Sequence, residues 1–179
     1  KRLVILLLSI CPMLAMAQGH KGSVEACAPM KEGKVCYSDE VDVEGMKKGE
    51  LFNAIDKWAK KNYGKDVFLS SVTSSKSKGT IFINSKVELL LNDKTIVKYK
   101  MRIYCFDEKY TIELTDITYQ YDPNNEKKYK TYPAENVIAN NGKSNTIALI
   151  KDPLLFCNAT FFFAENLFGD VFDAAEDSN

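Results

Sequence analysis

Three consecutive segments within residues 79–121 alternate apolar and polar side chains, the period of a β-strand with one buried face. The first two keep their apolar residues on odd positions, over 81–91 and 97–105. Only Asn92-Asp93-Lys94 and Asp107-Glu108-Lys109 separate the segments. Such short turns join antiparallel neighbours, because parallel strands need a long crossover. The sequence therefore predicts an antiparallel meander at the centre of the fold.

The third segment changes phase along its length. Its first apolar residues lie on even positions, at Ile112 and Leu114. The later ones lie on odd positions, at Ile117, Tyr119 and Tyr121. A strand cannot keep one face buried across such a change unless it contains an extra residue. We therefore expect a β-bulge near Thr115-Asp116.

Two main helices flank this meander in the sequence. One begins near Lys48 and ends at Gly64, which is free to adopt the positive φ of a helix terminus. Trp58 is expected to anchor this helix in the core. The other helix covers Asn158 to Ala175, after a turn begun by Asp152-Pro153. The remaining expected elements are a strand at 34–43, a strand at 66–72, a polar loop at 70–79 and a short helix at 133–138.

The predicted fold class is α+β. We expect a curved antiparallel sheet of about five strands, in the order β-α-β-β-β-β-α, with both main helices on one face. Residues 34–179 form this single domain, and 18–33 form a flexible lead-in rich in glycine.

Residues 1–17 have the pattern of a cleavable signal peptide. A basic start is followed by an apolar run and by Ala15-Met16-Ala17, which leaves Gln18 as the new N-terminus. A membrane anchor is the alternative, but the apolar run of about 15 residues is shorter than the roughly 20 that span a bilayer. Lipoprotein processing at Cys11 is disfavoured by the bulky Ile10. We expect an exported protein of the periplasm, the cell envelope or the medium, with no transmembrane span after cleavage.

Four cysteines follow the signal peptide: Cys27, Cys36, Cys105 and Cys157. Export permits disulfides, and four cysteines allow three full pairings. Cys27 and Cys36 close a short loop and are one candidate pair. Cys105 shares the parity of the apolar residues around it, which favours a buried free thiol. The spacings match no zinc motif.

These elements resemble an uncharacterised family of exported bacterial proteins, described as a domain of unknown function with a TBP-like fold. The likeness spans about residues 34–175 and rests on Leu51-Phe52 with Trp58, Gly79-Thr80-Ile81, Ile117-Thr118-Tyr119, Tyr132-Pro133-Ala134-Glu135 and the aromatic last helix. The resemblance implies a curved antiparallel sheet with helices on one face. It implies no activity and supplies no catalytic, metal-binding or cofactor-binding residues.

The residues themselves carry little catalytic chemistry. The only histidine, His20, lies next to the predicted cleavage site, which argues against Ser-His-Asp and Cys-His catalysis. We expect no cofactor and assign no catalytic residue. A hydrolase acting on envelope or dietary glycans is the rival hypothesis, and it would need paired carboxylates such as Glu88, Glu113 or Asp116.

The strongest candidate for a binding surface is the polar side of the meander. It gathers basic and aromatic residues, namely Phe82, Lys86, Lys98, Lys100, Arg102, Tyr104 and also Phe106. The alternative is an ordinary solvated sheet face. The last helix is a second candidate, because Phe161-Phe162-Phe163 and Leu167-Phe168 cover more than one of its sides.

Charge and export narrow the class of partner. The chain holds 24 basic and 24 acidic residues, so loss of Lys1 and Arg2 leaves 22 against 24 and a net charge of −2. Such a balance gives no overall attraction to nucleic acid. We therefore favour a non-enzymatic module that binds an envelope protein or glycan through the open sheet face or an edge strand. A structural subunit of an envelope assembly is a further alternative, and the oligomeric state stays open.

Overall fold

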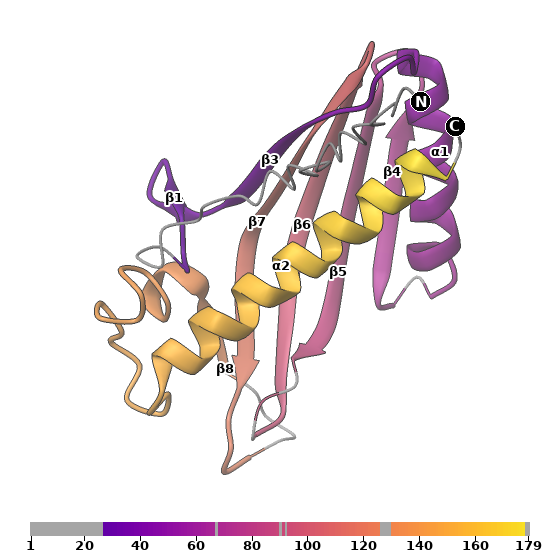
Figure 1. Ribbon diagram of the computed structural model, residues 1–179. Helices are drawn as coiled ribbons and strands as arrows, with labels where there is room; N and C mark the ends of the chain where they lie inside the picture. The colour runs from indigo at the N-terminus through magenta and orange to yellow at the C-terminus, as the bar shows by residue number, and fades with distance from the viewer. Residues whose placement is uncertain (1–26, 67, 90, 92, 126–129, 178–179) are drawn as a thin grey trace, which may run out of the picture.

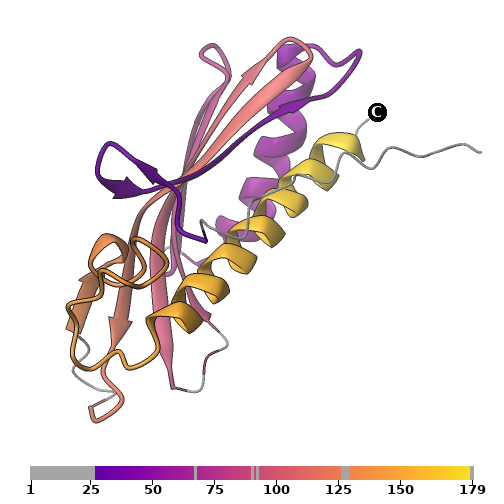
Figure 2. The ribbon, with the colours of Figure 1, turned by 60° about the vertical axis from the view of Figure 1, so that its left-hand side comes forward.

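The computed structural model describes residues 27–66, 68–89, 91, 93–125 and 130–177. One antiparallel sheet of six strands forms the body of the domain, in the order β3-β7-β6-β5-β4, with β8 also paired to β7. Both helices lie on the same face of this twisted sheet (Figures 1 and 2). The elements are β1 (Met30–Lys31), β2 (Lys34–Val35), β3 (Tyr37–Asp42), α1 (Lys48–Tyr63), β4 (Ser70–Ser75), β5 (Thr80–Leu89), β6 (Thr95–Phe106), β7 (Lys109–Tyr121), β8 (Lys130–Pro133), the 3-10 helix η1 (Ala134–Asn136) and α2 (Pro153–Glu176).

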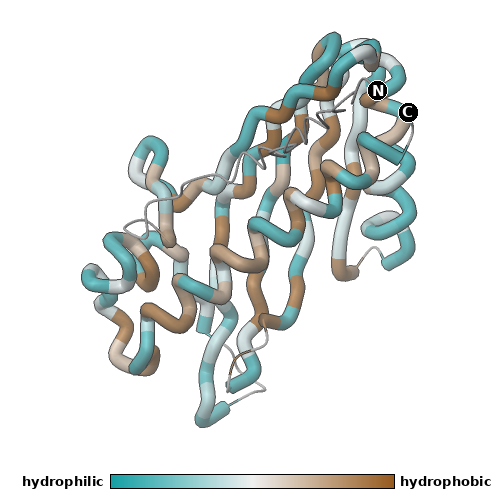
Figure 3. Tube along the Cα trace, in the orientation of Figure 1, coloured by the Kyte–Doolittle hydropathy of each residue, from teal (hydrophilic) through white to brown (hydrophobic). Residues whose placement is uncertain are grey.

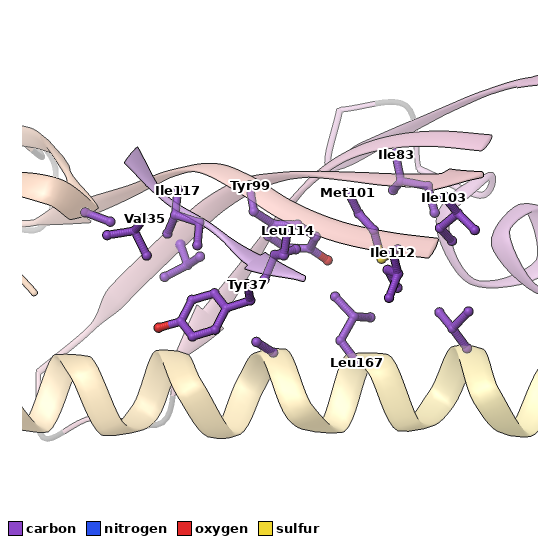
Figure 4. Close-up of a cluster of buried hydrophobic side chains, with 14 of the residues drawn as sticks. Val35, Tyr37, Ile83, Tyr99, Met101, Ile103, Ile112, Leu114, Ile117 and Leu167 are labelled. Atoms are coloured by element: carbon purple, nitrogen blue, oxygen red, sulfur yellow. The ribbon is translucent and has the colours of Figure 1, made fainter. Parts of the chain in front are cut away.

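The predicted meander is confirmed as β5, β6 and β7. Ile81 pairs with Ile103, and Ile103 pairs with Ile112, so one row of apolar side chains crosses all three strands. Figure 3 shows the alternation of hydropathy along these strands. The apolar side chains lie between the sheet and α2, where Met101, Leu114 and Leu167 are among the core residues (Figure 4). Burial of this face is the main force that holds the helices on the sheet.

The predicted bulge in β7 is also confirmed. Lys98 of β6 pairs with Thr118, whereas Lys100 pairs with Thr115, so two residues of β7 lie opposite one residue of β6. Asp116 lies in this bulge with a φ of 51°, a left-handed conformation that aspartate tolerates better than most residues. The extra residue lets apolar side chains on both sides of the bulge face the helices.

Two strands were misjudged from the sequence. The strand expected at 66–72 is instead the edge strand β4 at Ser70–Ser75, which extends into the run expected as loop and pairs with β5 from Ser70↔Ser85 to Ser75↔Thr80. Strand β4 lies at the edge of the sheet and buries little apolar surface, so a polar sequence suffices to form it. β8 was not predicted, because its pairing of Lys130–Pro133 with β7 depends on a distant segment. The expected strand at 34–43 is divided into β2 and β3.

Gly79 explains one of the motifs that carried the family resemblance. Its φ is +71°, and a Cβ at this position would lie 2.7 Å from the carbonyl oxygen of Cys105 and overlap Cε of Lys48. The amide of Cys105 also donates to the Gly79 carbonyl at 2.7 Å. Backbone and side chain therefore approach so closely that only glycine fits where β5 begins.

The helices differ from expectation in detail. Leu51, Phe52 and Ile55 of α1 are buried, but Trp58 is only half-buried and packs edge-on against Tyr63 at 5.6 Å between ring centroids. Trp58 is therefore not the central anchor that the sequence suggested. The other helix, α2, begins at Pro153, five residues earlier than expected, because Oδ1 of Asp152 accepts a hydrogen bond from the Leu155 amide at 3.0 Å.

One disulfide joins Cys27 to Cys157 at the start of α2. The candidate pair Cys27–Cys36 is therefore wrong, and Cys36 and Cys105 are free buried thiols, as expected for Cys105. Cys27 is held further by its amide, which donates to Oδ1 of Asn141 at 3.1 Å. The part of the lead-in from residue 27 onward thus contacts the domain, whereas the signal peptide expected at residues 1–17, the rest of the lead-in and His20 lie outside the described residues. None of the described helices combines the length and hydropathy that a membrane span requires.

Two buried tyrosines differ in their hydrogen bonding. The Tyr119 hydroxyl lies 2.7 Å from Oγ1 of Thr160, which itself donates to the Phe156 carbonyl at 2.7 Å. Tyr119 is therefore the donor in its pair. The Tyr110 hydroxyl has no hydrogen-bond partner among the described residues, although its side chain is fully buried.

Candidate binding surface

The face of the sheet opposite the helices, called here the open face, carries all the candidate residues from the strands. Cross-strand pairing places Lys86 opposite Lys98, and Phe82 opposite Arg102. Tyr104 lies diagonally from Phe82, and the two rings meet edge to face at 5.9 Å. The structure therefore brings the predicted basic and aromatic residues together on one surface, with Phe106 at the end of β6.

The hairpin of β1 and β2 covers one part of the open face (Figure 2). Lys31 forms an ion pair with Glu113, and Lys34 forms one with Asp116. A polar hollow of about 320 Å³ remains between the hairpin and the sheet, beside the buried Cys36 thiol. The sequence did not indicate this cover, because residues 30–35 were expected to lie in a mobile lead-in and the first strand.

Asp116 neutralises the basic residues nearest the hairpin. Its carboxylate contacts Lys34, lies 3.0 Å from Nζ of Lys100 and lies 4.0 Å from a guanidinium nitrogen of Arg102. Hydrogen bonds from Lys34 and then Lys100 lower the pKa of Asp116 below its ordinary value. The bulge thus holds an ionised carboxylate among three cations, so Asp116 is a poor proton donor.

Lys86 and Lys98 form the other half of the basic surface and lack such a partner. They lie directly opposite each other and form no ion pair with any described residue. Like charges in this arrangement destabilise a sheet by a few tenths of a kcal/mol to about 1 kcal/mol. An anionic group bound between them would remove that repulsion.

A shallow depression of about 510 Å³, called here the lysine hollow, adjoins these two lysines. Phe68 and Leu69 form one wall and are 88% and 48% exposed. Large apolar side chains exposed side by side are typical of contact surfaces. The lining also includes Asn84, Lys86, Lys98 and Lys100. Phe68 and Leu69 were placed in a short strand from the sequence, so their exposure was missed.

A second depression, of about 380 Å³, lies on the other side of the sheet between β5 and the helices. The lining of this helix-side hollow is mixed: Tyr63, Val87, Tyr99, Phe163 and Leu167 supply its apolar part, and Lys65, Asp66 and Asp170 are among its charged residues. Burial raises the pKa of Tyr63 and Tyr99, so both hydroxyls are neutral. The Tyr99 hydroxyl donates a hydrogen bond to the Tyr63 hydroxyl at 3.3 Å. Leu69, Ser85 and Lys86 line both hollows.

Two of the carboxylates that the hydrolase hypothesis would pair, Glu88 and Glu113, lie far apart on the sheet. Strand β6 separates β5 from β7, and the β6 residues opposite these glutamates are Ile96 and Arg102. Those positions are six residues apart along one strand, which corresponds to about 20 Å at roughly 3.3 Å per residue. Such a separation is too large for two carboxylates acting on one glycosidic bond. Within the described part of the chain, no group of three or more metal-ligating side chains is present.

The last helix divides its aromatic residues between core and solvent. Phe156 is buried and Phe163 is partly buried, whereas Phe162 and Phe172 are exposed. The buried face runs through Ala164, Leu167 and Val171. Core packing therefore accounts for most of the apolar character of α2.

Comparison with known proteins places this architecture in a family. The family model described as a domain of unknown function (DUF4468) with TBP-like fold matches residues 37–120. The crystal structure of a TBP-like protein from Parabacteroides distasonis is similar, with 75% identity and a TM-score of 0.83 over 86% of this chain and 99% of that chain. A DUF4468 family protein from Bacteroides ovatus has 25% identity and a TM-score of 0.70 over 84% of this chain and 91% of that chain. No curated protein matches the chain. The resemblance drawn from the sequence is confirmed, and the chain belongs to the DUF4468 family of TBP-like fold.

Proposed function

We propose that this protein is an exported, non-enzymatic module that binds an acidic protein partner at the lysine hollow. The observation that carries the proposal is the pair Lys86 and Lys98, opposite each other without a counter-ion among the described residues and beside the exposed Phe68 and Leu69. A partner carboxylate would relieve the lysine repulsion, and apolar partner groups would cover the two exposed side chains.

The combination of charge and apolar exposure favours a protein over a glycan. Interfaces between proteins commonly place an aromatic anchor inside a polar rim, as Phe68 lies beside the lysines here. A binding role also agrees with the ionic state of Asp116, whose lowered pKa suits a fixed charge better than a general acid. Export rests on the signal-peptide pattern of residues 1–17.

The test compares two variants of equal charge change. Lys86→Ser with Lys98→Ser removes the lysine pair, whereas Lys57→Ser with Lys61→Ser removes two exposed lysines from α1. Immobilised protein is exposed to solubilised envelope, and the captured partner is purified and titrated against each variant. We expect at least about a tenfold loss of affinity for the first variant and less than about a twofold change for the second.

Equal binding by both variants would contradict the proposal. A captured partner that resists protease but is destroyed by periodate would identify a glycan instead of a protein. Export is checked separately by cell fractionation and by N-terminal sequencing, for which we expect Gln18 as the first residue. Recovery of the uncleaved chain from the cytosol would overturn export.

A further inference from the structure

Strand β5 extends past the point where β4 begins, and there its side facing β4 has no paired strand among the described residues. Ser70 begins β4 and pairs with Ser85, but β5 continues to Leu89 (Figure 1). β6 pairs with β5 along its other side as far as Leu89↔Thr95. No described strand pairs with Lys86–Leu89 on the β4 side, and this four-residue stretch is called here the β5 edge.

A local turn explains why β4 begins so late. The carbonyl of Asp66 accepts hydrogen bonds from the amides of Leu69 and Ser70, at 3.1 and 2.9 Å, and its side chain accepts one from Phe68 at 2.9 Å. This turn brings the chain from the end of α1 directly to Ser70. It also points Phe68 and Leu69 outward, next to the point where pairing with β5 stops.

A free strand edge offers a regular set of hydrogen-bonding groups. Along an antiparallel strand, alternate residues direct both N–H and C=O toward the same side. Within the β5 edge, such groups have only solvent to bond when no further strand lies beside them. An extended segment placed there would continue the line of β4 and complete the sheet.

The two hollows lie on opposite faces of the sheet along this edge. Leu69, Ser70, Ser85, Lys86 and Tyr99 line both hollows, which therefore meet where β4 begins and the unpaired part of β5 starts. Successive side chains of an added strand point to opposite faces. One would therefore enter the helix-side hollow beside its apolar residues Val87, Phe163 and Leu167, and the next would face Lys86 and Lys98 across the lysine hollow.

We propose that the β5 edge binds an extended segment of the acidic protein partner as an added strand, with apolar and acidic side chains in alternation. This inference rests on the proposed function and names the form in which the partner binds. Main-chain hydrogen bonds supply affinity, and the two hollows supply specificity for the alternating pattern. The β5 edge also carries Glu88 on the same face as Lys86, so a second copy is kept as an outcome of the test; the unpaired Lys98 on the neighbouring strand favours a partner with acidic side chains.

The test uses synthetic peptides of about seven residues, a common strand length, in which aromatic or aliphatic residues alternate with glutamate or aspartate. Matched peptides carry lysine in place of the acidic residues. Two further versions are N-methylated at alternate amides, one in each phase. Binding to the chain from Gln18 onward, which contains every described residue, is measured by fluorescence anisotropy, and amide exchange is measured by NMR.

We expect the acidic peptides to bind and the lysine peptides to bind at least about tenfold more weakly. Methylation in one phase should abolish binding, whereas methylation in the other should change affinity by less than about twofold, because only alternate amides face β5. Bound peptide should slow amide exchange within Lys86–Leu89. Leu69→Asp should weaken binding at least about tenfold, while Leu154→Asp, at an equally exposed site on α2, should not.

The outcomes separate this inference from the proposed function. Peptide binding that tolerates methylation in both phases and protects no amide of the β5 edge would overturn strand addition but leave the lysine hollow as a binding site. Binding by none of the peptides would also overturn it, and the titration of the envelope partner would then decide the proposed function alone. Protection of the β5 edge that appears without peptide, at high protein concentration, would identify a second copy as the occupant and refute the inference.

Discussion

The disulfide between Cys27 and Cys157 should supply a large part of the stability of this domain. The two cysteines are separated by 130 residues, so the bond closes a loop that spans almost the whole domain. The chain-entropy relation gives about 5 kcal/mol for a loop of this size at 25 °C. The double variant Cys27→Ser with Cys157→Ser keeps the contacts that position residue 27, including the hydrogen bond from the Tyr37 hydroxyl to its carbonyl at 2.7 Å. We therefore expect it to fold and to lose about 3–5 kcal/mol in the free energy of unfolding.

Urea unfolding provides the assay, with fluorescence of the single tryptophan as one probe and far-UV circular dichroism as the other. With an m-value of about 2 kcal/mol per molar, the expected loss lowers the midpoint by about 1.5–2.5 M. Reductant should lower the midpoint of the wild-type protein to that of the double variant and leave the double variant unchanged. A midpoint shift below about 0.5 M would refute the argument that loop closure dominates.

Three further perturbations test the packing and the electrostatics. Gly79→Ala should lower the free energy of unfolding by about 2–4 kcal/mol, because the φ of Gly79 and the nearby backbone both exclude a Cβ. Gly49→Ala in α1 has open space around the added Cβ and should raise the free energy of unfolding by about 0.5–1 kcal/mol. Urea midpoints that move equally in the two variants would contradict this. Tyr119→Phe should lower the free energy of unfolding by about 1–2 kcal/mol, because a buried hydrogen bond is lost. Tyr110→Phe should leave the protein as stable or make it more stable in thermal melts, because the Tyr110 hydroxyl has no partner among the described residues. A larger loss for Tyr110→Phe than for Tyr119→Phe would refute this account of the two hydroxyls. Since ion pairs lower the pKa of Asp116, its contribution to stability is complete above the ordinary value of 3.8 and is lost as the pH falls through the lowered value. Asp116→Asn should therefore be less stable than wild type near pH 6, and the difference should shrink as the pH falls below 3.8 and through the lowered pKa of Asp116; a difference that stays constant would show that the charge is not responsible.

Much of the fold follows from local patterns. The alternation within residues 81–105 predicted which face of the sheet is buried, and the change of phase between Leu114 and Ile117 predicted the bulge. Both are periodic signals, set by the covalent spacing of the chain, so neighbouring residues suffice to read them. Edge strands were harder to predict, because β4 buries little apolar surface and β8 exists only through its pairing with β7.

The candidate surface was predicted in part. Parity placed Lys86, Lys98 and Phe82 on one face, and the register confirms this by pairing Lys86 with Lys98 and Phe82 with Arg102. The neutralising role of Asp116 depends on Lys34 from a distant hairpin, which no short-range pattern reveals. The exposure of Phe68 was also hidden, since apolar residues in a strand-like run are normally buried.

The amino-acid sequence by itself determined that this chain builds an antiparallel meander with one apolar face and one basic, aromatic face. Only the tertiary structure decided that Cys27 bonds to Cys157, that a hairpin covers one end of the open face, and that β5 keeps a free edge between two hollows. The physical reason is the distance along the sequence over which each feature is set. Side-chain alternation is imposed residue by residue along the backbone. Each of those later features depends instead on where turns and helices bring segments that are remote in sequence.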